Sequence, residues 1–193
     1  MTKDPRSNLD GKGWEAKIGN RSDQYPGFLA QLEAREPYRF RFARFEPQVR
    51  GLIRIETGLP DYCYALDGKM GMVECKHFSA TDAKLEGLDR QKGEIVAWKK
   101  AGVQSWVAVQ VEVDDRKLEK ARQTSLIGAQ PLPPIIRRLI PADQWLILAD
   151  RAEAARLAGK RPKASIPPAE LMQMGYPLDS VDDFWTAITS EKR

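Results

Sequence analysis

The chain has 193 residues, of which 42% are hydrophobic, enough for one domain with a sizeable core over residues 1–193. Its net charge of +4 and pI near 9.1 are compatible with nucleic acid as a partner but do not identify one. Two cysteines and one histidine exclude a disulfide framework and a multi-histidine metal site. No apolar run approaches the ~20 residues of a membrane span, and the N-terminus does not resemble a signal peptide. We therefore expect a soluble, cytoplasmic protein with no membrane partner.

The N-terminal region predicts a flexible polar tail over residues 1–10, followed by two helices. Trp14 and Ile18 lie four residues apart and give Gly11–Gly19 one apolar helical face. Pro26 and Pro37 delimit a second helix over about 26–36.

A basic stretch follows. Residues 38–45 alternate aromatic and mostly basic side chains, which predicts a half-buried strand with one cationic face. A further strand is expected over 49–56. Arginine suits bidentate contact with phosphate, although an ordinary solvated strand face would look the same in sequence. The residues that we predict to contact nucleic acid are Arg39, Arg41, Arg44, Arg50, Arg54 and His77.

The stretch Pro60–Lys76 predicts a β-hairpin, because two apolar runs flank the turn pair Asp67-Gly68. A two-residue loop would place Asp61 opposite Glu74, and a four-residue loop would place it opposite Lys76. Either loop brings the three charges to one face of the sheet, because strand side chains alternate and directly opposed residues share a face. A three-residue loop would break this arrangement. Cys75 would point to the other face.

Two carboxylates and a lysine on one face form a plausible site for Mg²⁺-dependent phosphodiester hydrolysis. Mg²⁺ prefers oxygen ligands and is commonly held by one or two carboxylates together with substrate phosphate. A lysine beside it can orient the attacking water and offset negative charge in the transition state. The alternative is a surface hairpin whose charges form a salt-bridged, solvated face, because Asp-x12-Glu-x-Lys alone is a weak pattern.

The middle of the chain predicts an α/β unit. A Ser/Thr/Asp stretch at 79–82 is expected to open a helix that contains Gln91 and ends before Gly102. Residues 105–113 then form a strand whose nearly continuous apolar start indicates burial on both faces, as in parallel strands.

The C-terminal half is less regular. Residues 114–143 look like a basic, proline-containing insertion. We expect a short strand over 145–149, a helix over 150–159, a short helix over 169–174 and a last helix near 181–190.

In their order and spacing, these residues resemble the PD-(D/E)XK nuclease superfamily and, within it, the RecU-type Holliday junction resolvases. The resemblance spans most of the chain. Its motifs are Gly11-Lys12-x-x-Glu15, Asp61-Tyr62, Glu74-x-Lys76, Gln91, and near the C-terminus Ser165-Ile166-Pro167 with Glu170 and Gly175-Tyr176.

The resemblance implies an α/β, restriction-endonuclease-like fold: a mixed β-sheet with a catalytic hairpin, flanked by helices. It also implies a homodimer that uses Mg²⁺ or Mn²⁺ to make paired nicks in four-way DNA junctions during recombination and repair. On this reading Asp61, Glu74 and the backbone carbonyl of Cys75 hold the metal, and Lys76 positions the water. Glu15 and Gln91 support the site.

The chain also departs from the family pattern. His77 stands where an acidic residue is expected, and the 114–143 segment looks longer than the family's connection there. The family has a junction-inserting stalk before the catalytic aspartate; residues 45–59 hold that position here, and whether they form a stalk stays open. Three alternatives therefore stay open: another nuclease on the same fold, of the flap-repair or restriction type; a non-catalytic DNA-binding module on that scaffold; and a structural interaction protein.

Overall fold

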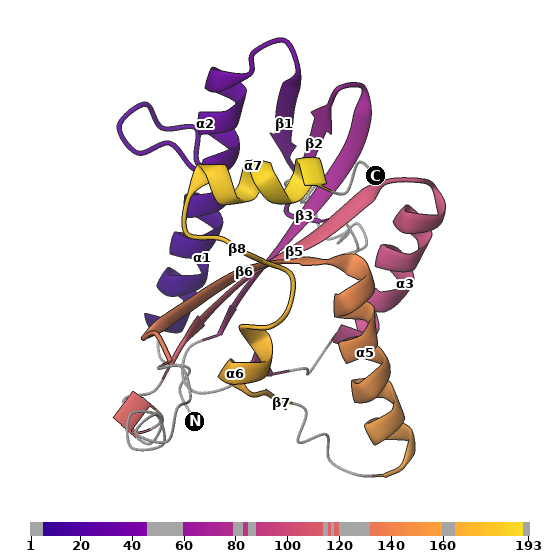
Figure 1. Ribbon diagram of the computed structural model, residues 1–193. Coiled ribbons are helices and arrows are strands. Elements are labelled where there is room, and N and C mark those ends of the chain that lie inside the picture. Colours follow the sequence, from indigo (N-terminus) through magenta and orange to yellow (C-terminus); the bar gives the residue numbers. More distant parts are fainter. Residues whose placement is uncertain are drawn as a thin grey trace, which may run out of the picture.

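The computed structural model describes residues 6–45, 60–78, 83–84, 88–113, 116, 118–119, 132–159 and 165–190. They form a mixed α/β structure in which helices flank a six-stranded, mostly antiparallel open sheet (Figure 1). The helices are α1 (Arg6–Gly19), α2 (Phe28–Arg35), α3 (Leu88–Lys100), α5 (Ala142–Leu157), α6 (Pro168–Leu171) and α7 (Val181–Ser190). The strands are β1 (Phe40–Arg44), β2 (Tyr62–Leu66), β3 (Lys69–Phe78), β4 (Ala83–Lys84), β5 (Gln104–Glu112), β6 (Ile135–Pro141), β7 (Ser165–Ile166) and β8 (Tyr176–Pro177).

The main sheet has the strand order β1-β2-β3-β5-β6-β8, and β4 pairs with β7 in a separate two-stranded sheet. The β3–β5 pair is parallel, and the other neighbours in the main sheet are antiparallel. Helix α3 makes the connection between the two parallel strands, as such a pair requires. The predicted succession of hairpin, helix and buried strand is thereby confirmed.

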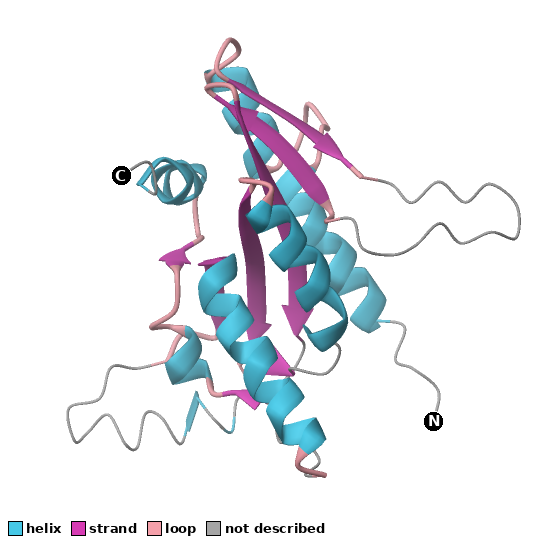
Figure 2. Ribbon diagram, turned by 90° about the vertical axis from the view of Figure 1, so that its right-hand side faces the viewer, coloured by secondary structure: helices cyan, strands magenta, loops and turns pink. Residues whose placement is uncertain are grey.

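Two hydrophobic clusters lie on the two faces of the sheet. Strand β5 contributes to both: Trp106 and Ala108 belong to the cluster that includes residues of α1, α2 and α7, whereas Val107 and Val109 belong to the cluster on the side of α5 and α6. In Figure 2, α3 and α5 lie in front of the sheet, with α1 and α2 behind it. This double burial explains the continuous apolar run in the β5 sequence.

Several boundaries differ from the sequence predictions. Helix α1 begins at Arg6, so its first turns replace part of the predicted tail. Tyr38 is fully exposed in a turn, and strand β1 begins only at Phe40. Helix α3 begins at Leu88, after the short strand β4, rather than at residues 79–82. The strand predicted over 49–56 and most of the stalk segment lie outside the described residues.

The largest error concerns residues 135–157. The predicted strand over 145–149 is wrong, because these residues form the middle of α5. Trp145, Leu148 and Ala149 are buried at helical spacing, whereas Ile147 is 56% exposed. Strand β6, at the end of the predicted insertion, was not anticipated. Among the described helices, none combines the length and apolar character needed to cross a bilayer.

Two glycines with positive φ give a test of this packing. At Gly102 (φ 82°) an added Cβ would meet nothing within 4 Å, whereas at Gly175 (φ 54°) it would lie 2.3 Å from the Leu139 carbonyl oxygen. We expect Gly102→Ala to cost about 1 kcal/mol through backbone strain. Gly175→Ala should cost at least about 2 kcal/mol more, because the main chain of β6 must move. Urea denaturation of both variants measures the difference, and equal losses would contradict the packing of the α6–β8 segment on β6.

Candidate functional site

The turn of the β2–β3 hairpin sets the geometry of the candidate site. Asp67 and Gly68 both have positive φ, 50° and 78°, as a two-residue type I′ turn requires. The strand register runs from Leu66 opposite Lys69 to Tyr62 opposite Val73. One step further, the same register sets Asp61 opposite Glu74, which is the two-residue-loop alternative predicted from sequence.

Asp61 directly precedes β2, at the end of the hairpin that lies away from the turn. Regular pairing of β2 with β3 ends at Val73, and beyond it the Cys75 N–H donates to Asp61 Oδ2 at 2.6 Å. The N–H and C=O of one strand residue point to the same side of the strand. The Cys75 carbonyl therefore faces the side on which Asp61 lies, as a metal-binding role would require.

Glu74 and Lys76 form a half-buried ion pair on β3. Their side chains are 16% and 24% exposed, and Lys76 Nζ lies 2.8 Å from Glu74 Oε1. Both residues share the sheet face of Val107 and Val109, with which they are in register. Cys75 instead packs against the opposite cluster, as predicted, and burial raises the pKa of its thiol.

The environment raises the pKa of Asp61 to about 6. Burial is the largest cause, and the negative charge of Glu74 adds to it. The hydrogen bond from the Cys75 N–H and the charge of Lys76 act in the opposite direction, while Glu15 raises the pKa further. The negative charges of Asp61 and Glu74 therefore repel each other, and the Cys75 N–H and Lys76 offset this repulsion only in part. A bound cation would offset the rest.

Helix α1 holds Glu15 near enough for its charge to act on Asp61. Tyr62 Oη donates to the Glu15 carbonyl oxygen at 2.9 Å, and Arg44 Nη2 lies 3.0 Å from Glu15 Oε2. Burial raises the pKa of Tyr62, so the phenol stays protonated and able to donate. Tyr62 and Arg44 were not predicted to have this anchoring role. Tyr62 could have been noticed in the sequence, because it follows Asp61 directly in the quoted motif. Arg44 could not, because it lies far from Glu15 in the chain.

Two further predicted residues, Gln91 and His77, lie on α3 and β3. Gln91 lies in α3, but its side chain is outside the described part of the chain. His77 is 5% exposed and faces away from Glu74 and Lys76, with Nε2 3.4 Å from Glu112 Oε1.

The predicted nucleic-acid-binding arginines make local ion pairs where they are described. Arg39 binds the turn residue Asp67 through two hydrogen bonds of 2.9 and 3.0 Å. Arg44 pairs with Glu15, whereas Arg41 is 64% exposed and lies 4.0 Å from Glu33. Arg50 and Arg54 lie outside the described residues.

The donor set is compatible with Mg²⁺ or Mn²⁺. Within the described ranges, no three His, Cys, Asp or Glu side chains cluster as a ready-made metal site. A site with two carboxylates, Asp61 and Glu74, and the Cys75 carbonyl leaves positions for waters and substrate phosphate, which is the usual arrangement for Mg²⁺.

A comparison of the sequence with models of known protein families and with curated proteins finds no match.

The raised pKa of Asp61 predicts a pH-dependent stability. A carboxyl with a pKa of about 6 in the folded protein, against an ordinary value of 3.8, stabilises the fold fully below pH 3.8. This contribution is lost as the pH rises through about 6. In metal-free buffer, Asp61→Asn should therefore be more stable than the wild type at pH 7.5, by about 1–2 kcal/mol after allowance for partial exposure. The advantage should shrink towards pH 4.

Urea denaturation of both proteins across this pH range measures the effect. Asp23→Asn, an equivalent exchange at an exposed loop position, serves as the control. A destabilised Asp61→Asn protein at pH 7.5 would show instead that the carboxylate is well satisfied, as expected for an ordinary salt-bridged hairpin.

Proposed function

We propose that this protein is a metal-dependent, structure-selective DNA endonuclease of the PD-(D/E)XK type. Its proposed substrate is the four-way junction, in which it makes paired nicks during recombination and repair. The observation that carries the proposal is the hairpin register, whose continuation one step beyond the Tyr62–Val73 pair would set Asp61 opposite Glu74, with Lys76 on the same face.

The architecture supports a restriction-endonuclease-like arrangement. The hairpin is followed by a crossover helix and a parallel neighbouring strand, and α1 brings Glu15 towards Asp61. Asp61, Glu74 and Lys76 thus lie on one hairpin, and the charge of Glu15 on α1 acts on Asp61, in keeping with the set of residues that the resemblance relates.

A solvated salt-bridge face explains the site less well. Glu74 and Lys76 are mostly buried, and the pKa of Asp61 is raised rather than lowered. An ion pair that served only to stabilise the hairpin would gain from solvation and would not need a second carboxylate opposite it. Carboxylates held together at such a cost are typical of functional sites.

In the proposed reaction Asp61, Glu74 and the Cys75 carbonyl would hold Mg²⁺ or Mn²⁺. The ion would supply a Lewis acid for the phosphoryl oxygen and for the attacking water. Lys76 has the chemistry to orient that water and to offset the negative charge that builds on the phosphate, because its ammonium lies beside Glu74. Cleavage leaves 5′-phosphates.

Junction resolution further implies two active sites. A homodimer with two-fold symmetry suits a four-way junction, because each site can cut one of two equivalent strands. The choice of junction over flap or linear duplex rests on the resemblance, so the test must compare these substrates directly.

Cleavage of a labelled mobile four-way junction with Mg²⁺ or Mn²⁺, beside flap and linear duplex substrates, tests the proposal. Asp61→Ala, Glu74→Ala and Lys76→Ala should each reduce cleavage by at least about 10³-fold, because each removes a metal ligand or the water-orienting cation. Lys69→Ala, an exposed lysine at the start of the same strand, is the matched control and should cut normally.

The distribution of products separates the alternatives. Symmetric nicks in the junction alone support a resolvase. Cutting of flaps or duplex keeps the nuclease site but moves the function to repair or restriction. Junction binding without cutting under either metal would favour a non-catalytic DNA-binding module.

Metal binding is testable without activity. A cation that binds only the folded state raises the melting temperature, by an amount equivalent to about 2.7 kcal/mol at a hundredfold excess over its Kd. We expect Mg²⁺ or Mn²⁺ to stabilise the wild type and Lys69→Ala, but not Asp61→Asn or Glu74→Gln. Equal metal responses in all four proteins, measured by calorimetry, would place cation binding elsewhere.

A further inference from the structure

Among the described residues, strand β1 is an edge of the main sheet, with β2 as its one neighbour. The Arg39 carbonyl accepts from the Asp67 N–H at 3.0 Å, and the Phe45 N–H donates to the Asp61 carbonyl at 3.0 Å. Because backbone direction alternates along a strand, Phe40 and Phe42 must point their N–H and C=O groups outwards, away from β2. Such groups invite pairing with another strand.

Side chains and helix-end groups occupy this outward edge. The Phe40 N–H donates to the Glu36 carbonyl at 2.9 Å. The Phe42 N–H donates to Glu33 Oε1 at 3.4 Å, and the Phe42 carbonyl accepts from Arg21 Nη2 at 2.6 Å. Phe42 therefore has one acceptor and one donor beside it, which is what a hydrogen-bonded residue of a neighbouring antiparallel strand would supply.

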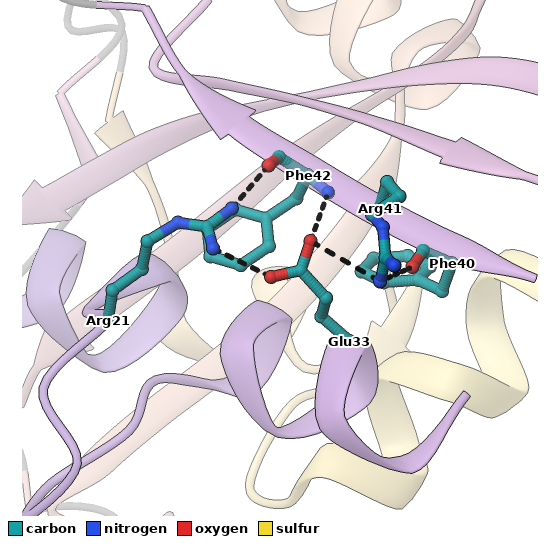
Figure 3. Close-up of polar contacts among 5 residues, drawn as sticks. All are labelled: Arg21, Glu33, Phe40, Arg41 and Phe42. Carbon is teal, nitrogen blue, oxygen red and sulfur yellow. Dashed lines mark hydrogen bonds and ion pairs between the residues drawn. The ribbon is translucent and has the colours of Figure 1, made fainter. Parts of the chain in front are cut away.

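Arg21 and Glu33, here called the edge clamp, also hold each other. Arg21 Nη1 lies 2.7 Å from Glu33 Oε2, and the Arg21 guanidinium lies over the Phe42 ring, 4.1 Å from its centroid. Figure 3 shows Glu33 between Arg21 and Arg41, with the backbone of Phe42 beside them. The Glu33 side chain is 17% exposed, so the carboxylate is fixed against the strand rather than free in solvent.

We infer that the edge clamp closes β1 to strand addition, and that the partner it excludes is a second copy of this chain. Antiparallel pairing of β1 with its own copy about a two-fold axis at Phe42 is self-complementary. It would set Phe42 against Phe42 and Arg41 against Ala43, so no arginine would face another arginine directly. This inference concerns the outer edge of β1, which is a different feature from the carboxylate pair that carries the proposed nuclease function.

The double variant Arg21→Ala/Glu33→Ala tests the inference. With the clamp removed, the Phe42 amide should exchange with solvent at least about 10-fold faster at low protein concentration, because its acceptor is gone. Light scattering after gel filtration should show species of at least twice the wild-type mass as the concentration rises. Adding Arg44→Pro should suppress them, because proline removes the next outward N–H and is tolerated at a sheet edge.

Arg151→Ala/Glu170→Ala is the matched control, because it removes a surface ion pair that is also 2.7 Å long. It should keep the wild-type mass. Three results would each overturn the inference: an unchanged Phe42 exchange rate in the double variant, assembly that persists with Arg44→Pro, or equal assembly of the control.

If the double variant does not fold, Glu33→Gln decides the question. Glutamine keeps an acceptor oxygen for the Phe42 N–H but removes the charge that holds Arg21 over the Phe42 carbonyl. A concentration-dependent rise in mass that Arg44→Pro suppresses supports the inference. A constant mass over the same concentrations overturns it.

Discussion

Asp67 and Gly68 make a two-residue turn with both φ angles positive, and this turn fixes every cross-strand pair beyond it. A slip by one residue would turn each side chain of one strand to the other face of the sheet. Asp61 would then no longer share a face with Glu74 and Lys76. Arg39 binds both carboxylate oxygens of Asp67 and so secures the turn. The geometry of the candidate site is therefore set at the opposite end of the hairpin.

The same register also produces an electrostatic cost at the end of the β2–β3 hairpin that lies away from the turn. Asp61 lies beside Glu74 in a partly buried position, and the Cys75 N–H and Lys76 compensate its charge only in part. A protein selected only for stability would place an apolar or amide side chain there, because a buried carboxylate near another is unfavourable. The electrostatic cost falls on Asp61 and Glu74, whose carboxylates are suited to bind a divalent cation. This favours a functional role, and not a stabilising one, as the reason for their presence.

Local signals predicted the hairpin, the doubly buried β5 and the last helix α7, but they left the hairpin register open between two loop lengths. Strand β6 was not predicted, because Arg137 and Arg138 look in sequence like charged surface residues. In the structure Arg137 pairs with Gln110 across the sheet, and Arg138 donates to the carbonyls of Met174 and Gly175. Partners that satisfy these arginines lie far along the chain or on its backbone, so no local pattern reveals them.

A similar reason explains the misread helix α5, where an apolar run fits either periodicity until the packing partners are known. In the candidate site, the sequence related Asp61, Glu74 and Lys76 because one hairpin contains them. It did not relate Arg44 to Glu15, because their contact depends on how α1 packs against the sheet. Spacing within one element is readable from sequence, whereas contacts between elements are not.

Strand β1 connects the edge clamp with the candidate site. Its outer side meets Arg21 and Glu33 at Phe42, and at its end Arg44 binds Glu15. The next residue, Phe45, donates its N–H to the Asp61 carbonyl. A displacement of β1 would therefore act on the backbone of Asp61 and on the side chain of Glu15 together. Strand addition at this edge would compete with the Arg21 and Glu33 contacts to Phe42, so the edge clamp also helps to keep β1, and with it the backbone contact to Asp61, in place.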